Sequence, residues 1–80
     1  MCIIVIKPAG VKMPAMETIE NCWYNNNDGA GFMYAKDGSV HIRKGFMTLK
    51  DFKAALKQLE KSIDIVNTPI IFHFRITTHG

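Results

Sequence analysis

The sequence is poor in several features on which whole classes of small protein depend. Its two cysteines, Cys2 and Cys22, cannot build the disulfide framework of a small secreted domain. The apolar run at residues 2–6 has no positive region before it, as a secretory signal would, and no apolar stretch approaches the roughly 20 residues that span a bilayer. Internal repeats and low-complexity tracts are also missing. These absences predict a reduced, cytoplasmic protein with no membrane segment.

The excess of positive over negative charge is small as well. The formal net charge is only +3, and much of the excess is carried by Lys50, Lys53, Lys57 and Lys61. These lysines recur at helical spacing and so indicate a solvated helix face, which argues against nucleic acid as a partner. Hydrophobic residues make up 48% of the chain, which argues against disorder. A chain of 80 residues is expected to form a single domain, residues 1–80.

The short motifs of metal and phosphate sites are absent. The cysteines and histidines do not fall at any of the short spacings that bind zinc. No glycine-rich phosphate loop is present, and no Ser-His-Asp arrangement can be assembled from the sequence. Neither a metal nor an organic cofactor is expected.

Along the chain, sequence patterns typical of strands alternate with patterns typical of helices. Residues 2–7 form a nearly continuous apolar run rich in β-branched side chains, which predicts a strand buried on both faces. Pro14 suits the first turn of a helix that the asparagines at 25–27 and Gly29 bring to an end. The apolar stripe of that helix is Met16, Ile19 and Trp23.

The middle of the chain carries a hairpin pattern. Residues 30–36 and 39–44 are predicted strands on either side of Asp37-Gly38, a dipeptide whose members both tolerate positive φ. Thr48 then suits an N-cap, with Asp51 in the first helical turn. The helix that follows has an apolar stripe at Leu49, Phe52, Leu56, Leu59 and Ile63.

A last strand is predicted after Thr68-Pro69. One of its faces is wholly apolar and consists of Ile70, Phe72, Phe74 and Ile76. The other face consists of Ile71, His73, Arg75 and Thr77. The predicted order is therefore β-α-β-β-α-β, which defines an α+β fold and by itself favours a ferredoxin-like two-layer sandwich. A plain ferredoxin-like domain would cover one sheet face with two helices and bury Cys2 far from Arg75.

Cys2 is the first of three places where chemistry is expected. A small second residue suits removal of Met1, which would leave Cys2 with both a thiol and a free α-amine. The amine, with a pKa near roughly 8, can take the proton of the thiol and return one to a leaving group. The alternative is a small buried hydrophobe at the start of a strand.

The second place is the segment Asp28-Gly29-Ala30-Gly31. A helix stop followed by a loop explains one glycine but not both. Gly31, at the start of a strand, predicts that some group approaches the backbone closely.

The third place is Arg75 together with Thr78 and His79. An arginine in a strongly apolar strand needs a partner if it is buried, and a guanidinium suits a carboxylate. Thr78 and His79 add hydrogen-bond donors beyond the strand. The alternative is the exposed polar edge of the last strand.

These three features together resemble the glutaminase domain of class II glutamine amidotransferases, which are N-terminal nucleophile (Ntn) hydrolases. Members begin with Met-Cys and carry an Arg-x-x-Thr-His-Gly segment after the same run of elements, and here that segment is residues 75–80. The match follows the whole chain in order. This chain has Ile3 where glycine is common, and Ile76-Thr77 where synthase members have Trp-Ala.

The resemblance implies that Cys2 attacks the side-chain amide of glutamine, or of a related small amide, and releases ammonia. It also implies that Arg75, Thr78 and His79 hold the carboxylate end of the substrate, beside a site loop with Asp28, Gly29 and Gly31. The chain would be the front portion of an αββα sandwich and the N-terminal part of a longer domain. The oxyanion-hole Asn-Gly of the family is not among these residues. Because losing such a donor costs roughly 10²–10³ in turnover, the chain alone is expected to be a weak catalyst.

Two further hypotheses remain open. In the first, the chain is a truncated, non-catalytic relative that serves as a binding or interaction module. The sheet face without its facing layer would then be an apolar patch for a second copy or a complementing chain. In the second, the chain is an unrelated ferredoxin-like binding domain.

Overall fold

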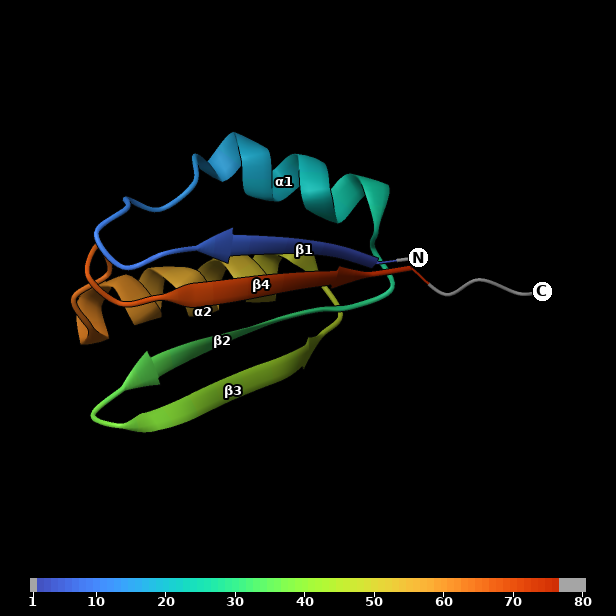
Figure 1. Ribbon diagram of the computed structural model, residues 1–80. Coiled ribbons are helices and arrows are strands. Elements are labelled where there is room, and N and C mark those ends of the chain that lie inside the picture. The colour runs from blue at the N-terminus through green and yellow to red at the C-terminus, as the bar shows by residue number, and fades with distance from the viewer. Residues whose placement is uncertain (1, 77–80) are drawn as a thin grey trace.

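The computed structural model describes residues 2–76 and confirms the predicted α+β order. The six elements are β1 (Cys2–Lys7), α1 (Met16–Asn25), β2 (Ala30–Lys36), β3 (Ser39–Phe46), α2 (Leu49–Ser62) and β4 (Ile70–Arg75). The four strands form one sheet in the order β1-β4-β2-β3, and every neighbouring pair is antiparallel (Figure 1). The last strand of the chain thus lies inside the sheet. It separates β1 from β2, which run parallel to each other.

The helix ends follow local chemistry. At α2 the Asp51 N–H donates to Thr48 Oγ1 at 3.1 Å, so Thr48 is the N-cap that the sequence predicted. The start predicted for α1 was two residues too early. Pro14 precedes the helix, and the N-cap is Ala15, whose side chain makes no capping hydrogen bond.

The hairpin between β2 and β3 turns at the predicted dipeptide. Asp37 and Gly38 both have positive φ, 53° and 77°, which a two-residue hairpin loop of this kind requires. The predicted second strand ended at residue 44, but β3 continues to Phe46. A bulge at Gly45, with φ 85°, lets Ala30 pair with Phe46 while Gly31 pairs with Lys44.

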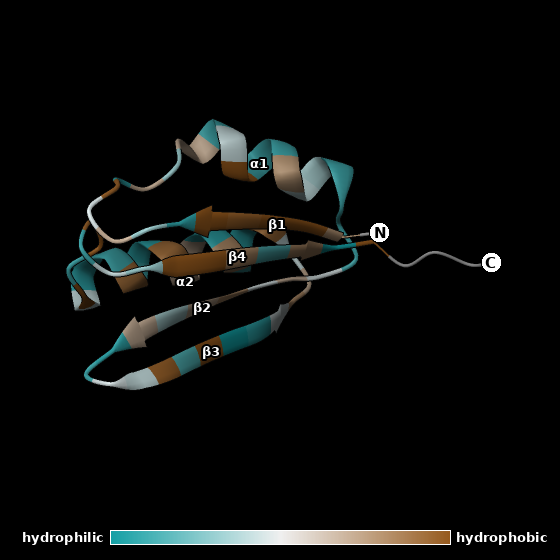
Figure 2. Ribbon diagram, in the orientation of Figure 1, coloured by the Kyte–Doolittle hydropathy of each residue, from teal (hydrophilic) through white to brown (hydrophobic). Residues whose placement is uncertain are grey.

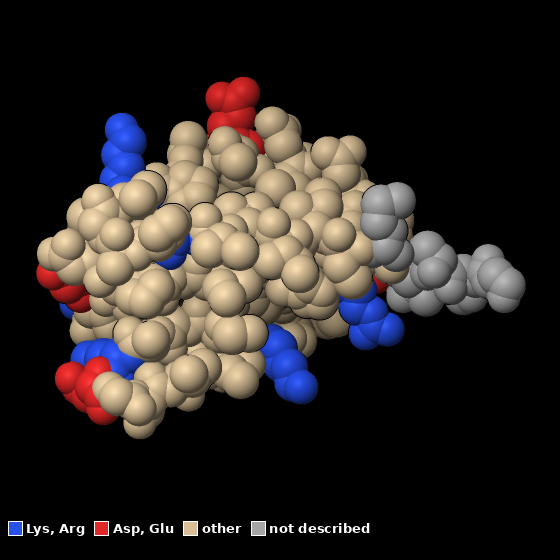
Figure 3. Space-filling model, in the orientation of Figure 1, with Lys and Arg blue, Asp and Glu red and all other residues tan. Residues whose placement is uncertain are grey.

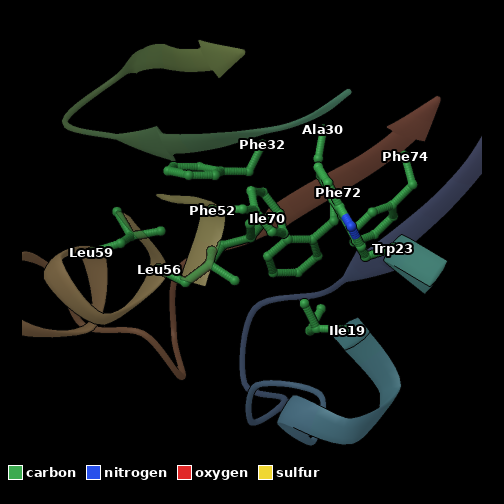
Figure 4. Packing of buried hydrophobic residues seen from close by; sticks show 10 residues of the cluster. All are labelled: Ile19, Trp23, Ala30, Phe32, Phe52, Leu56, Leu59, Ile70, Phe72 and Phe74. Carbon is green, nitrogen blue, oxygen red and sulfur yellow. The ribbon is translucent and has the colours of Figure 1, made fainter. Parts of the chain in front are cut away.

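Both helices cover the same face of the sheet and share one core with it. Alternate residues of β4 point to this face, and three of them, Ile70, Phe72 and Phe74, have no exposed surface. Figure 4 shows these side chains meeting Ile19 and Trp23 from α1. The core is completed from β2 and α2 by Ala30, Phe32, Phe52, Leu56 and Leu59.

The other face of the sheet is not covered by any described residue. Within residues 2–76, Ile4 and Ile6 of β1 are 62% and 67% exposed, so the prediction of a strand buried on both faces was wrong. The reason is that β1 is an edge strand of a sheet whose helices all lie on one side. Figure 2 shows β1 and β4 as the two most apolar strands, side by side. In Figure 3 the middle of the face over these strands is mostly uncharged.

Sequence reasoning missed a buried cation at the end of β1. Lys7 is only 2% exposed and lies on the helix-covered face, opposite Ile70. Its ammonium donates to three backbone carbonyls, Val11 O at 2.6 Å, Val66 O at 2.9 Å and Pro8 O at 3.2 Å. Burial of the charge is tolerated because all three donor positions are used. Lys7 therefore joins the turn after β1 to the segment that precedes β4.

Candidate functional site

The three places singled out in the sequence meet at one end of the uncovered sheet face. β1 and β2 begin at this end, and β4 ends there (Figure 1). Cys2 is directly opposite Arg75 in the antiparallel register of β1 and β4. Residues opposite each other in such a pair project to the same face, with Cβ atoms about 5 Å apart. Both side chains are exposed, so the Cys2 thiol and the Arg75 guanidinium share one accessible surface.

The segment 28–31 is tied to Arg75 through the backbone. The Asp28 N–H donates to Arg75 O, and the Arg75 N–H donates to Gly29 O, both at 2.8 Å. Asn26 adds a longer bond from Nδ2 to Phe74 O, at 3.4 Å. Gly29 has a φ of 145°, which side chains rarely allow. The loop therefore continues the β2–β4 pairing beyond β2 and holds a fixed position next to Arg75.

The close approach predicted at Gly31 is present, and the approaching group is β3. A Cβ on Gly31 would lie 2.8 Å from Arg43 O and 3.0 Å from the Cα of Lys44. The bulge at Gly45 brings the two backbones together at this position. The second glycine of the segment is therefore needed for packing between strands, because the backbone of β3 takes the place of a side chain there.

A pocket of about 330 Å³ lies next to these glycines. Its walls are contributed by three strands and by the loops at their ends. Its lining residues are Asp28, Gly29, Ala30, Gly31, Lys44, Gly45, Met47, His73 and Arg75. Arg75 lies between Cys2 on β1 and Gly31 on β2, because β4 separates these two strands. The site thus runs across the sheet from the thiol, past the guanidinium, to the pocket.

For Arg75 the sequence left two possibilities, a buried guanidinium that needs a partner or an exposed polar position on the last strand. Its side chain lies on the uncovered face and is exposed, which agrees with the second. The position is not at the edge of the sheet, however, because β4 pairs with β1 on one side and β2 on the other. The departure at Ile3 does not crowd the thiol. Ile3 is half-buried and packs against the core, on the face away from Cys2.

The two cysteines lie on opposite sides of the sheet. Cys22 is half-buried in α1 and packs against the core, whereas Cys2 is exposed on the open face. The exposed position of Cys2, opposite Arg75, differs from the buried Cys2 expected of a plain ferredoxin-like domain. The arrangement of two helices on one face of the sheet agrees with that alternative.

Two predicted site residues, Thr78 and His79, lie outside the described residues. Lys44 and His73 are pocket residues that the sequence did not single out. His73 could have been found, because it is two residues before Arg75 and therefore shares its face. Lys44 could not, because its place depends on the bulge register of β3.

Neither a metal-ligand cluster nor a membrane-spanning helix is found in the described part of the chain. Residues 2–76 contain no cluster of three His, Cys, Asp or Glu side chains that could hold a metal ion. Over the same residues, neither helix has the length and apolar character to cross a membrane. Comparisons with protein-family models, with curated proteins and with solved structures found no match to this chain.

Proposed function

We propose that the chain is the front part of an amidohydrolase of the glutamine amidotransferase type, in which Cys2 attacks a small amide such as glutamine. The observation that carries the proposal is the exposed pair of Cys2 and Arg75, opposite each other on adjacent strands. Adjacent strands are about 4.8 Å apart, which suits a short substrate that reaches from a nucleophile to a carboxylate-binding cation. The fixed loop 28–31 supports the proposal by lying next to Arg75, on the side away from Cys2.

In the proposed reaction, removal of Met1 frees the α-amine of Cys2, which takes the thiol proton. The thiolate forms a C–S bond to the amide carbon, and the C–N bond breaks as the ammonium returns a proton to departing ammonia. Water then hydrolyses the thioester and regenerates the thiol. Arg75 holds the carboxylate end of the substrate, with Thr78 and His79 in the supporting roles that the resemblance implies. The oxyanion donors are supplied from outside these 80 residues.

A glutamine-directed electrophile tests this proposal. When the intact mass of the protein shows that Met1 has been lost, labelling is expected at Cys2. The Cys2→Ser substitution should abolish this labelling. Cys22→Ser is the matched control and should leave labelling unchanged. Chain that retains Met1 should react roughly 10²–10⁴-fold more slowly, because its Cys2 nitrogen is an amide and cannot act as a base. Labelling at Cys22 instead of Cys2 would overturn the proposal.

A second candidate function, an interaction module, is favoured by the apolar row on the open face. In register, Ile6 pairs with Ile71, Ile71 with Met33, and Met33 with Ile42, so one row of apolar side chains crosses all four strands. Contiguous exposed apolar surface of this kind is typical of interaction sites. A second copy or a complementing chain is the proposed occupant. Two cysteines without a disulfide support a cytoplasmic setting for either function.

Sedimentation velocity over a range of concentrations tests the second function. Self-association is expected, and Met33→Lys should abolish it by placing a charge in the middle of the row. Tyr24→Lys is the control, because Tyr24 is 68% exposed on α1 and lies on the other side of the sheet. A wild-type chain that stays monomeric at the highest concentration would contradict self-association through this face.

A further inference from the structure

Two glycines make a hollow in the open face of the sheet. Gly31 of β2 is in register with His73, and Gly29 lies just before β2 with a φ of 145°. Both line the pocket, and neither places a side chain in it. Their neighbours on β4 are Arg75 and His73, and Gly31 also pairs with Lys44 on β3. The side chains of Lys44, His73 and Arg75 therefore line the pocket on both sides of these glycines. We call this part of the pocket the glycine hollow.

Long cationic side chains flank the glycine hollow on both sides. β3 and β4 are separated by β2, so Lys44 and Arg75 come from strands about 9.5 Å apart, or two strand spacings. Both side chains line the same pocket. The neighbouring cation in β3, Arg43, lies elsewhere, 5.2 Å over the ring of Phe46. Alternation along β3 thus assigns Arg43 to the aromatic core face and Lys44 to the open face.

The charge around the hollow is positive. Among residues 2–76 the only ion pair joins Lys53 to Glu20, so neither Lys44 nor Arg75 is neutralised by a carboxylate in that part of the chain. Asp28 is the single acidic residue of the lining, against the two cations Lys44 and Arg75. An anion in the hollow would be attracted from both sides.

We propose that the glycine hollow binds a single small oxyanion, carboxylate or phosphate, held by Lys44 from one side and Arg75 from the other. Lys44 is then a specificity residue that selects ligands with an anionic end. The identification of that ligand as an amide substrate rests on the proposed function, because it requires Cys2 to be the nucleophile. The binding of the anion does not require Cys2. The ligand class that follows is a small amide with a carboxylate at its other end.

Two isosteric probes test the charge requirement. Glutaramate carries a carboxamide and a carboxylate, whereas glutaramide replaces the carboxylate with a second, neutral carboxamide. In amide-resolved NMR titrations of the whole chain, glutaramate is expected to shift the backbone N–H signals of Gly29 and Gly31. Glutaramide should leave them unchanged. Equal binding of the two probes would overturn the proposal.

Lys44→Gln tests the second cation. Its dissociation constant for glutaramate is expected to rise at least about threefold, because one of two flanking charges is lost at a partly screened site. Lys36→Gln is the matched control, since Lys36 is an exposed lysine at the far end of β2. A dispersed spectrum for Lys44→Gln shows that the fold is kept. An unchanged dissociation constant in that variant would overturn the role of Lys44.

Two further arms separate this inference from the proposed function. Cys2→Ser should bind glutaramate as the wild type does, because anion binding does not require the thiol. A wild-type chain that binds glutaramate but is not labelled at Cys2 would reject only the amidohydrolase. Inorganic phosphate should compete with glutaramate if the hollow is a general oxyanion site. Phosphate binding without glutaramate binding would keep the anion site and detach it from amide chemistry. Binding of neither anion would overturn the inference even if Cys2 is labelled.

Discussion

Ile70→Ala is expected to lower the free energy of unfolding by about 2–5 kcal/mol. Ile70 has no exposed surface and lies on the helix-covered face of β4, an interior strand. Truncation removes three buried carbons and leaves a cavity that the sheet and helices can close only in part. For a chain of this length, total stability is roughly 4–12 kcal/mol, so the variant loses a large share of it.

Ile6→Ala is the matched control for Ile70→Ala. The same three carbons are removed one strand away, but Ile6 is 67% exposed on the open face. The expected change is within about 0.5 kcal/mol. Urea unfolding of both variants, at a concentration where the chain is monomeric, gives the comparison. Equal losses in the two variants would show that the open face is covered in solution, and would contradict the one-sided core.

The order of elements could be predicted because each carries its own local signal. The stripe of α2, the Thr48 cap and the Asp37-Gly38 turn depend only on residues close in sequence. The order of strands in the sheet depends on contacts between distant residues. The run at residues 2–7 is apolar at almost every position, so its composition could not distinguish a buried strand from an edge strand with one open face.

The candidate site also combines residues with a local signal and positions that depend on contacts between distant residues. Cys2, Arg75 and the loop 28–31 could be chosen from the sequence because each departs from ordinary patterning. Their proximity follows from β4 entering between β1 and β2, which no local pattern specifies. To predict the position of Lys44, the bulge at Gly45 must also be known, because it sets which residue of β3 faces Gly31.

Lys7 shows how an unusual residue can escape sequence reasoning altogether. A lysine at the end of a strand is usually solvated, and nothing nearby indicates that three carbonyls will surround it. Val11 O, Val66 O and Pro8 O come from two segments that meet only in the folded chain. Asp64 lies at the start of the second segment. Hydrogen bonds from the Asn67 side chain and then from its backbone hold the pKa of the Asp64 carboxyl below its usual value, with a smaller effect of Lys7.

Lys7→Met is therefore expected to destabilise the protein by about 1.5–3 kcal/mol, the range for hydrogen bonds to a charged group. Methionine keeps most of the buried stem but donates to none of the three carbonyls. Pro8 O and Val66 O still accept from backbone N–H groups of Val11 and Gly10, so the loss is concentrated at Val11 O, the shortest contact. Lys12→Met, at an exposed lysine five residues on, should change stability by less than about 0.5 kcal/mol.

Hydrogen exchange distinguishes a local clamp from a general packing role for Lys7. The Gly10 N–H donates to Val66 O at 2.9 Å and reports on the contact between the two segments. In Lys7→Met this amide should exchange faster by a larger factor than amides in the centre of β4, because the segments separate before the sheet opens. If Gly10 and the β4 amides accelerate by the same factor, Lys7 stabilises the whole fold and does not act as a clamp between the turn after β1 and the segment before β4.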